Sequence, residues 1–262
     1  MAAGTLATYW KKYKAISPWT AMAAYMVTLV VWGILFLPPT AERVTIAALV
    51  IPLGLTLDYL LHRAQTGKPN WESALITSSI VTVLMPASVA LYVPPLAVAL
   101  AIASKHFLLH GKRHVFNPAA FGVAVTAVAF GYSLGWWSDS YLWLTLLFGL
   151  INVWRVKKFP QVLTFLVAYL VLVLAVDGSL SLSTFSASTL GTQTVPLLLP
   201  FFFAFFMLPE PVTSLRPRSQ QVEFGLVAAL AGFLVSFVPV LSGGAILWGL
   251  LVANVYARAR VV

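Results

Sequence analysis

Two short polar stretches of this sequence carry the residue types that could hold a polar ligand. In "FFMLPEPVTS", Glu210, Thr213 and Ser214 follow an apolar block, and a carboxylate with two hydroxyl groups can hydrogen-bond the edge of a cofactor. In "GKRHVFNPAAFG", Asn117 and Pro118 follow a basic cluster. Asn and Pro are also favoured where a helix begins, since Asn caps backbone N–H groups and Pro suits the first turn. Each stretch alone therefore allows both a binding and a purely structural interpretation.

Three more residues are candidates for contact with the same ligand. Lys105 stands in "ASKHFLLHGKRH", ahead of Asn117, and Ser73 and Thr77 stand in "ESALITSSIVTVLMP". Hydroxyl groups on one face of a helix can receive the polar edge of a ligand, or they can hydrogen-bond a neighbouring helix. We include all three among the predicted cofactor-binding residues.

The histidines have a spacing that could bind a metal ion or haem iron. His106, His110 and His114 are four residues apart, so a continuous helix would place them on one face. They stand among Lys and Arg at the edge of an apolar block, which favours an interfacial role. We therefore expect neither a metal site nor haem.

Asp58 is an acidic residue inside an apolar block. An acid at membrane depth normally faces the protein interior or a water-filled cavity, and it can mark an ion path. The simpler interpretation is a pair with His62, four residues later, or with Arg63.

The composition is that of an integral membrane protein. Of 262 residues, 60% are hydrophobic and 9% are charged, whereas soluble domains are roughly a quarter charged. The net charge of +9 comes from short basic clusters between apolar blocks, which indicates membrane topology and argues against nucleic acid as a partner. Without cysteine, the chain cannot bind an iron-sulfur cluster through thiolates.

Ten apolar blocks could each cross the lipid bilayer, several of them as tilted or broken helices. If the N-terminus is cytoplasmic, fifteen of the sixteen Lys and Arg residues fall on the cytoplasmic side, and only Arg43 does not. This follows the positive-inside rule. We expect a multi-pass protein of the inner (plasma) membrane with both termini cytoplasmic. Residues 1–18 form a cytoplasmic segment without a cleaved signal peptide, and residues 19–262 form one transmembrane domain. The predicted spans are 19–37, 44–61, 74–91, 93–109, 116–134, 141–153, 162–176, 195–208, 224–240 and 244–256.

The ten spans divide into two halves of five, about 19–135 and 136–262. An odd number of spans per half places the halves in opposite orientation, as inverted-repeat membrane folds require. The third span of each half is rich in proline, in "VLMPASVALYVPP" and "VPLLLPFFFAFFMLPEP". Such interrupted spans point to a binding site between the halves, although ordinary kinking at span ends produces the same pattern.

In combination, "FNPAAFG", "ESALITSSIVTVLMP", "FFMLPEPVTS" and the late "LLVANVYA" resemble the family of flavin-carrying membrane proteins shared by the Rnf electron-transport complex and the sodium-translocating NADH:quinone reductase (Nqr). The likeness runs from about residue 58 to the C-terminus. It implies an all-α membrane protein with ten transmembrane helices in two inverted five-helix halves, similar in architecture to urea transporters. It also implies electron transfer through flavins, alongside soluble or membrane flavin and iron-sulfur reductase subunits at the cytoplasmic face.

The chain departs from that family where the covalent flavin is normally attached. Between the fifth and sixth predicted spans it has only "GYSLGWWSDSYLW", without an S-G-A-T motif, and "STFSASTLGTQT" lies in another loop. We therefore expect a short relative that binds riboflavin or FMN non-covalently. It would be an electron-transfer subunit of a redox complex rather than a freestanding enzyme. The alternatives are a transporter or channel for a small polar solute or an ion, and a scaffold that anchors a soluble reductase.

Overall fold

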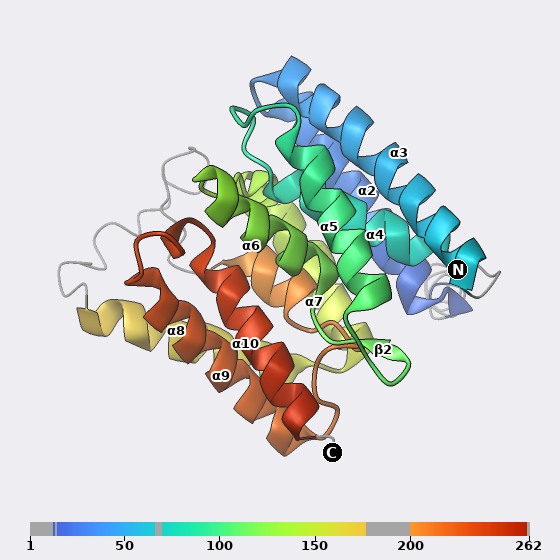
Figure 1. Cartoon of the computed structure of the whole chain (residues 1–262). Helices are drawn as coiled ribbons and strands as arrows, with labels where there is room; N and C mark the ends of the chain where they lie inside the picture. The colour runs from blue at the N-terminus through green and yellow to red at the C-terminus, as the bar shows by residue number, and fades with distance from the viewer. Residues whose placement is uncertain (1–12, 14, 66–69, 177–199, 261–262) are drawn as a thin grey trace, which may run out of the picture.

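The structure, a computed structural model, describes residues 13, 15–65, 70–176 and 200–260 (Figure 1). It is a helical bundle in which four helices, α2, α3, α8 and α9, are long and apolar enough to cross a membrane. Shorter apolar helices, α4 to α7 among them, pack between and beside these four. The predicted class, an all-α membrane protein, fits this architecture. The "STFSASTLGTQT" loop and most of the N-terminal segment lie outside the described residues.

A helix begins within or close to each predicted apolar block that the structure describes. The elements of the first part of the chain are α2 (Pro18–Phe36), α3 (Thr40–Gln65), α4 (Trp71–Leu84), α5 (Val93–Phe107), the hairpin strands β1 (Leu109–His110) and β2 (Arg113–His114), and α6 (Pro118–Phe130). Those of the second part are η1 (Trp137–Tyr141), α7 (Leu142–Val156), α8 (Phe159–Val176), the π-helical turn η4 (Phe203–Met207), α9 (Arg218–Ser236), η5 (Ser242–Gly244) and α10 (Ala245–Ala259).

Local chemistry accounts for the ends of several helices. Ser17 caps α2 and Asn70 caps α4 through their side chains, and Gly131 closes α6 in the left-handed conformation, with φ of 65°. Helix α4 ends at Leu84, seven residues before the predicted end of its span at residue 91, because Pro86 disfavours a helical residue before it. α4 is therefore shorter than a full membrane crossing.

The buried end of α4 is closed by donors from the chain that follows α6. The backbone N–H of Gly135 donates to the Leu84 carbonyl at 2.8 Å, and the indole N–H of Trp137 donates to the Met85 carbonyl at 2.7 Å. Leu84, Met85 and Trp137 are at most 1% exposed. Since water does not reach this helix end, the two donors satisfy carbonyl groups that would otherwise be unpaired.

Small residues allow the closest helix contacts. A Cβ atom built on Gly122 would lie 2.2 Å from the carbonyl oxygen of Ala97, so α6 and α5 touch through their backbones. Gly249 of α10 approaches Gly232 of α9 in the same way. The predicted role of Gly122 in close helix packing is confirmed. In Figure 1, α6 and α10 lie next to each other near the middle of the bundle, and these two helices contact each other.

Candidate functional site

The two polar stretches of the sequence meet at one end of the bundle. His114 Nε2 lies 3.2 Å from Glu210 Oε1, and the amide nitrogen of Asn117 donates to the Met207 carbonyl at 3.4 Å. The guanidinium group of Arg258 joins them, because it donates to the carbonyls of both His114, at 2.7 Å, and Val212, at 2.8 Å. We call the region formed by residues 113–118 and 207–217, with the last turns of α10, the polar junction.

Asn117 holds the centre of the polar junction as a helix cap. Its side-chain oxygen accepts a hydrogen bond from the Ala120 N–H at 3.0 Å, and Pro118 occupies the first helical position of α6. Its backbone N–H donates to Asn254 Oδ1 at 2.8 Å, and the Asn254 amide donates to the Thr213 carbonyl at 3.3 Å. The capping role predicted for Asn117 and Pro118 is confirmed, and Asn254 is a partner that the sequence did not indicate.

The remaining predicted residues of the second stretch bond one another. The Thr213 hydroxyl donates to Glu210 Oε2 at 2.8 Å, and the Ser214 hydroxyl donates to the Glu210 carbonyl at 2.6 Å. Thr213 and Ser214 are buried, and the Glu210 side chain is 15% exposed. These contacts fold the 210–214 segment into a tight turn. The turn itself therefore uses the hydrogen atoms of both hydroxyl groups.

Side chains from the chain around the α7–α8 connection satisfy the carbonyls at the end of the 200–208 segment. Asn152 donates to the Phe205 carbonyl at 2.9 Å, and Gln161 donates to the Leu208 carbonyl at 2.6 Å. This segment, like α4, ends among buried residues, since Leu208 is inaccessible to solvent. Neither amide was predicted, because an Asn or Gln inside an apolar block gives no sign of its distant partner.

Lys158 lies between α7 and α8 and is buried, with 3% of its surface exposed. Its ammonium group donates to the Leu215 carbonyl. Burial, and to a lesser degree the positive charge of Arg216, lowers the pKa of Lys158 to about 8. The sequence indicated only a topology signal here, and the structure adds a partly desolvated cation beside the polar junction.

Lys105 belongs to a different cluster, between α3 and α5. Its ammonium group lies 2.8 Å from Oδ1 of Asp58, which also lies 3.0 Å from His106 Nε2. Asp58 is 1% exposed, and its other oxygen lies 3.5 Å from His62 Nδ1. The predicted Asp58–His62 pair is confirmed. The partners on α5 were missed, although a buried acid requires a cation nearby.

The side chains of Asp58, His62 and His106 could supply ligand atoms to a metal ion, since these atoms lie within 4.8 Å of one another. Lys105 already places a positive charge against the carboxylate. A divalent cation bound there would meet the repulsion of that ammonium group at low dielectric. The cluster is therefore better explained as a neutralised buried acid.

The expected histidine face is wrong, because α5 ends at Phe107. Gly111, with φ of 63°, turns the chain into the β1–β2 hairpin, which carries His110 and His114 away from the helix. His106 contacts Asp58 and His114 contacts Glu210. The three rings do not share one helix face.

Ser73 and Thr77 lie on α4 and hydrogen-bond within that helix, the Thr77 hydroxyl to the Ser73 carbonyl at 2.9 Å. Glu72, beside them, accepts from the Thr20 hydroxyl at 2.6 Å. The junction thus brings together some of the predicted residues and leaves others apart. It unites Asn117, Pro118, Glu210, Thr213 and Ser214, whereas Lys105, Ser73 and Thr77 bond elsewhere.

Beside the junction is a cavity of about 250 Å³, lined by Thr213, Ser214 and three arginines. This is slightly below the range of about 300 to 1,000 Å³ that is usual for sites that enclose a drug-sized ligand. It can therefore hold one polar end of a larger cofactor, and not a whole one. Comparison with models of known protein families and with curated proteins finds no match for this chain.

Proposed function

We propose that this protein is a membrane-embedded electron-transfer subunit that binds a flavin non-covalently at the polar junction and relays electrons to or from a partner reductase. The observation that carries the proposal is the contact between the two stretches on which the family resemblance depends. Residues 114 and 210 are 96 positions apart in the chain, yet their side chains meet at 3.2 Å. Two polar stretches that meet at a buried helix end are suited to hold a cofactor at a defined position.

The residues that would hold the flavin are those with polar groups beside the cavity. Thr213 and Ser214 line it, with Glu210 directly behind them. When bound, a flavin supplies a redox centre that accepts and returns electrons. Because the cavity accommodates only one end of such a cofactor, the ring system would extend over the surface that Arg113 and Arg216 border. A partner protein docked on this face would cover it.

The arrangement of helices supports two related halves of five. In the first half α2 and α3 pack on α4, α3 packs on α5, and α5 packs on α6. In the second half α7 and α8 contact η4, α8 packs on α9, and α9 packs on α10. The same order of neighbours is expected of an inverted repeat with ten spans and a urea-transporter-like architecture. In both halves, the third segment ends next to a proline.

An absorption spectrum of the detergent-purified protein tests the flavin. We expect flavin bands in the protein as purified, or after addition of riboflavin or FMN and removal of the excess. Glu210→Gln is expected to weaken flavin retention while the helical circular dichroism is kept, and Glu223→Gln, at an exposed carboxylate of α9, is the matched control. If neither purification nor reconstitution yields flavin bands, the proposed function is wrong.

A transporter for a small polar solute is the second candidate. It is favoured by the two segments that end among buried residues, α4 at Leu84 and the 200–208 segment at Leu208. On α4, the buried hydroxyl groups of Ser78 and Ser79 make no hydrogen bond within the described part of the chain. Solute flux into liposomes that contain only this protein, with no bound flavin, would support this function over electron transfer.

A further inference from the structure

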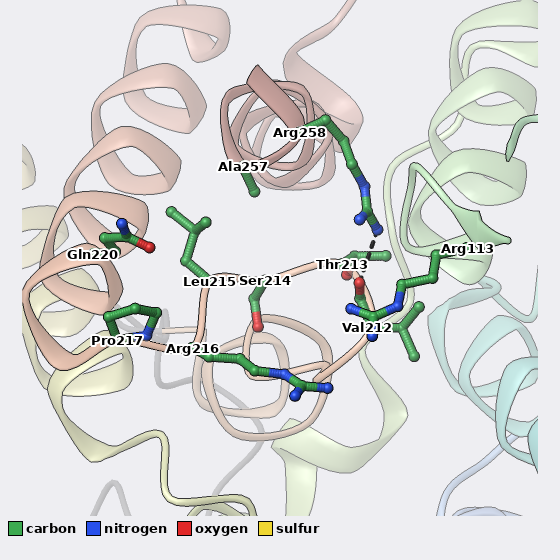
Figure 2. Close-up of a pocket in the computed structure, with 10 residues that line it drawn as sticks. All are labelled: Arg113, Val212, Thr213, Ser214, Leu215, Arg216, Pro217, Gln220, Ala257 and Arg258. Atoms are coloured by element: carbon green, nitrogen blue, oxygen red, sulfur yellow. Dashed lines mark hydrogen bonds between the residues drawn. The ribbon is translucent and has the colours of Figure 1, made fainter. Parts of the chain in front are cut away.

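The cavity beside the polar junction is walled by positive charge from three separate elements. Arg113 comes from β2, Arg216 from the segment before α9, and Arg258 from the last turn of α10. Figure 2 shows the three side chains around the 212–214 segment. Thr213, Ser214 and Gln220 complete the polar part of the wall.

These arginines have no carboxylate partner among the residues that the structure describes. Glu210 is close enough to influence Arg258, but its two oxygens are already bound by His114 and Thr213. Lys158 adds a further positive charge near Arg216. Gathering several cations around one cavity is electrostatically unfavourable unless an anion offsets their repulsion.

The cavity wall also offers hydrogen-bond donors that the protein leaves unused. The Nε of Arg258 is buried and has no acceptor within the described residues. Helix α9 begins at the cavity with Pro217 as its N-cap residue, which supplies no side-chain acceptor to the first turn. The start of this 19-residue helix therefore adds N–H groups and a partial positive charge to those of the guanidinium groups.

We propose that this cavity binds a phosphate group, either the headgroup phosphate of an anionic lipid or a phosphate free in solution. Guanidinium groups bind phosphate through paired, charge-assisted hydrogen bonds, which explains why the three basic side chains here are all arginine. The volume of about 250 Å³ suits one phosphate with a small substituent. The basic cytoplasmic side of a membrane protein is also where anionic lipids gather. This inference goes beyond the proposed function and holds without a flavin.

The test is the thermal stability of the full-length protein with two probes at constant ionic strength. One arm adds inorganic phosphate to the detergent-purified protein, with chloride as the reference salt. The other compares vesicles of phosphatidylcholine alone with vesicles that also contain phosphatidylglycerol. Stabilisation by inorganic phosphate assigns the soluble source, and stabilisation by phosphatidylglycerol alone assigns the lipid headgroup. If neither probe stabilises the protein, the proposal is overturned.

Variants locate the effect at the cavity. Arg216→Gln is expected to weaken the apparent affinity for the effective probe about tenfold, which is the loss of one charge-assisted hydrogen bond. Adding Arg113→Gln is expected to weaken it about tenfold again. Arg260→Gln, at an exposed arginine outside the cavity, serves as the control and should leave the affinity unchanged. Arg258 is left intact because it joins the two stretches of the junction.

Unchanged affinity in the Arg113/Arg216 double variant, with its helical circular dichroism retained, would also overturn the phosphate site. Neither readout depends on flavin absorption. A protein that binds phosphate without a flavin would therefore contradict the proposed function alone, and the reverse result would contradict the phosphate site alone.

Discussion

Replacement of Asp58 by Asn is expected to destabilise the protein strongly. The carboxylate is 1% exposed and lies 2.8 Å from Lys105 Nζ, whose side chain is 9% exposed. Asn keeps the shape but removes the negative charge, so that the ammonium group is left buried without a counter-ion. Removal of one partner from a buried ion pair typically costs about 3 to 5 kcal/mol, because the remaining charge is uncompensated.

The reverse substitution should cost less. In Lys105→Met the Asp58 carboxylate keeps His106 Nε2 at 3.0 Å and His62 Nδ1 at 3.5 Å, and either imidazole can take up a proton to offset its charge. In the double variant Asp58→Leu/Lys105→Met both charges are absent. Its stability should recover most of the loss, since apolar replacement of a whole buried pair is often close to neutral.

Thermal unfolding in detergent micelles, followed by helical circular dichroism, measures these effects. Glu223→Gln provides the comparison, because Glu223 pairs with Arg260 at 2.8 Å on the surface, with side chains 37% and 51% exposed. Its stability should change little, since exposed pairs are screened by water. If Asp58→Asn costs no more than Glu223→Gln, or if the double variant is less stable than Asp58→Asn, the pair is not the buried, mutually neutralising contact described here.

Two further predictions concern Lys158 and Gly122. Because the pKa of Lys158 is about 8 in the folded protein against an ordinary 10.5, the unfolded chain holds more protons between these values. Stability should therefore rise with pH by at most about 1.4 kcal/mol per unit in that window, a slope that a Lys158→Met variant should lack in the same melting experiment. Gly122→Ala places Cβ 2.2 Å from the Ala97 carbonyl oxygen and should cost about 1 to 3 kcal/mol. Gly244→Ala, whose nearest neighbour would lie 3.7 Å away, should unfold like the parent protein.

The sequence predicted the positions of the helices well, because apolar blocks and prolines act locally. Asn117 followed by Pro118 indicated the cap of α6, and the structure has that cap. Pro86 was recognised as an interruption, but the predicted span was continued past it to residue 91, whereas α4 ends at Leu84. Periodicity alone does not say whether a proline kinks a helix or ends it.

The contacts of the junction were not predictable from spacing. His114 and Glu210 meet across 96 residues, and Lys105 and Asp58 across 47. Lys158 has the same appearance in the sequence as the exposed Lys157 next to it. Only the packing of α8 against α9 and η4 determines that one is buried and the other is not. Pairing of distant polar residues is a property of the fold, and one sequence carries no record of it.

The two segments that end among buried residues are closed in chemically different ways. A backbone N–H and an indole, both neutral, close α4. At the end of the 200–208 segment and in the turn that follows it, two amides and the ammonium group of Lys158 take up the carbonyls, and three arginines stand around a cavity. Carbonyl groups alone need only neutral donors, as α4 demonstrates. The excess of positive charge at the second end is therefore not explained by closing the helix, and it is the feature that argues for an anionic ligand there.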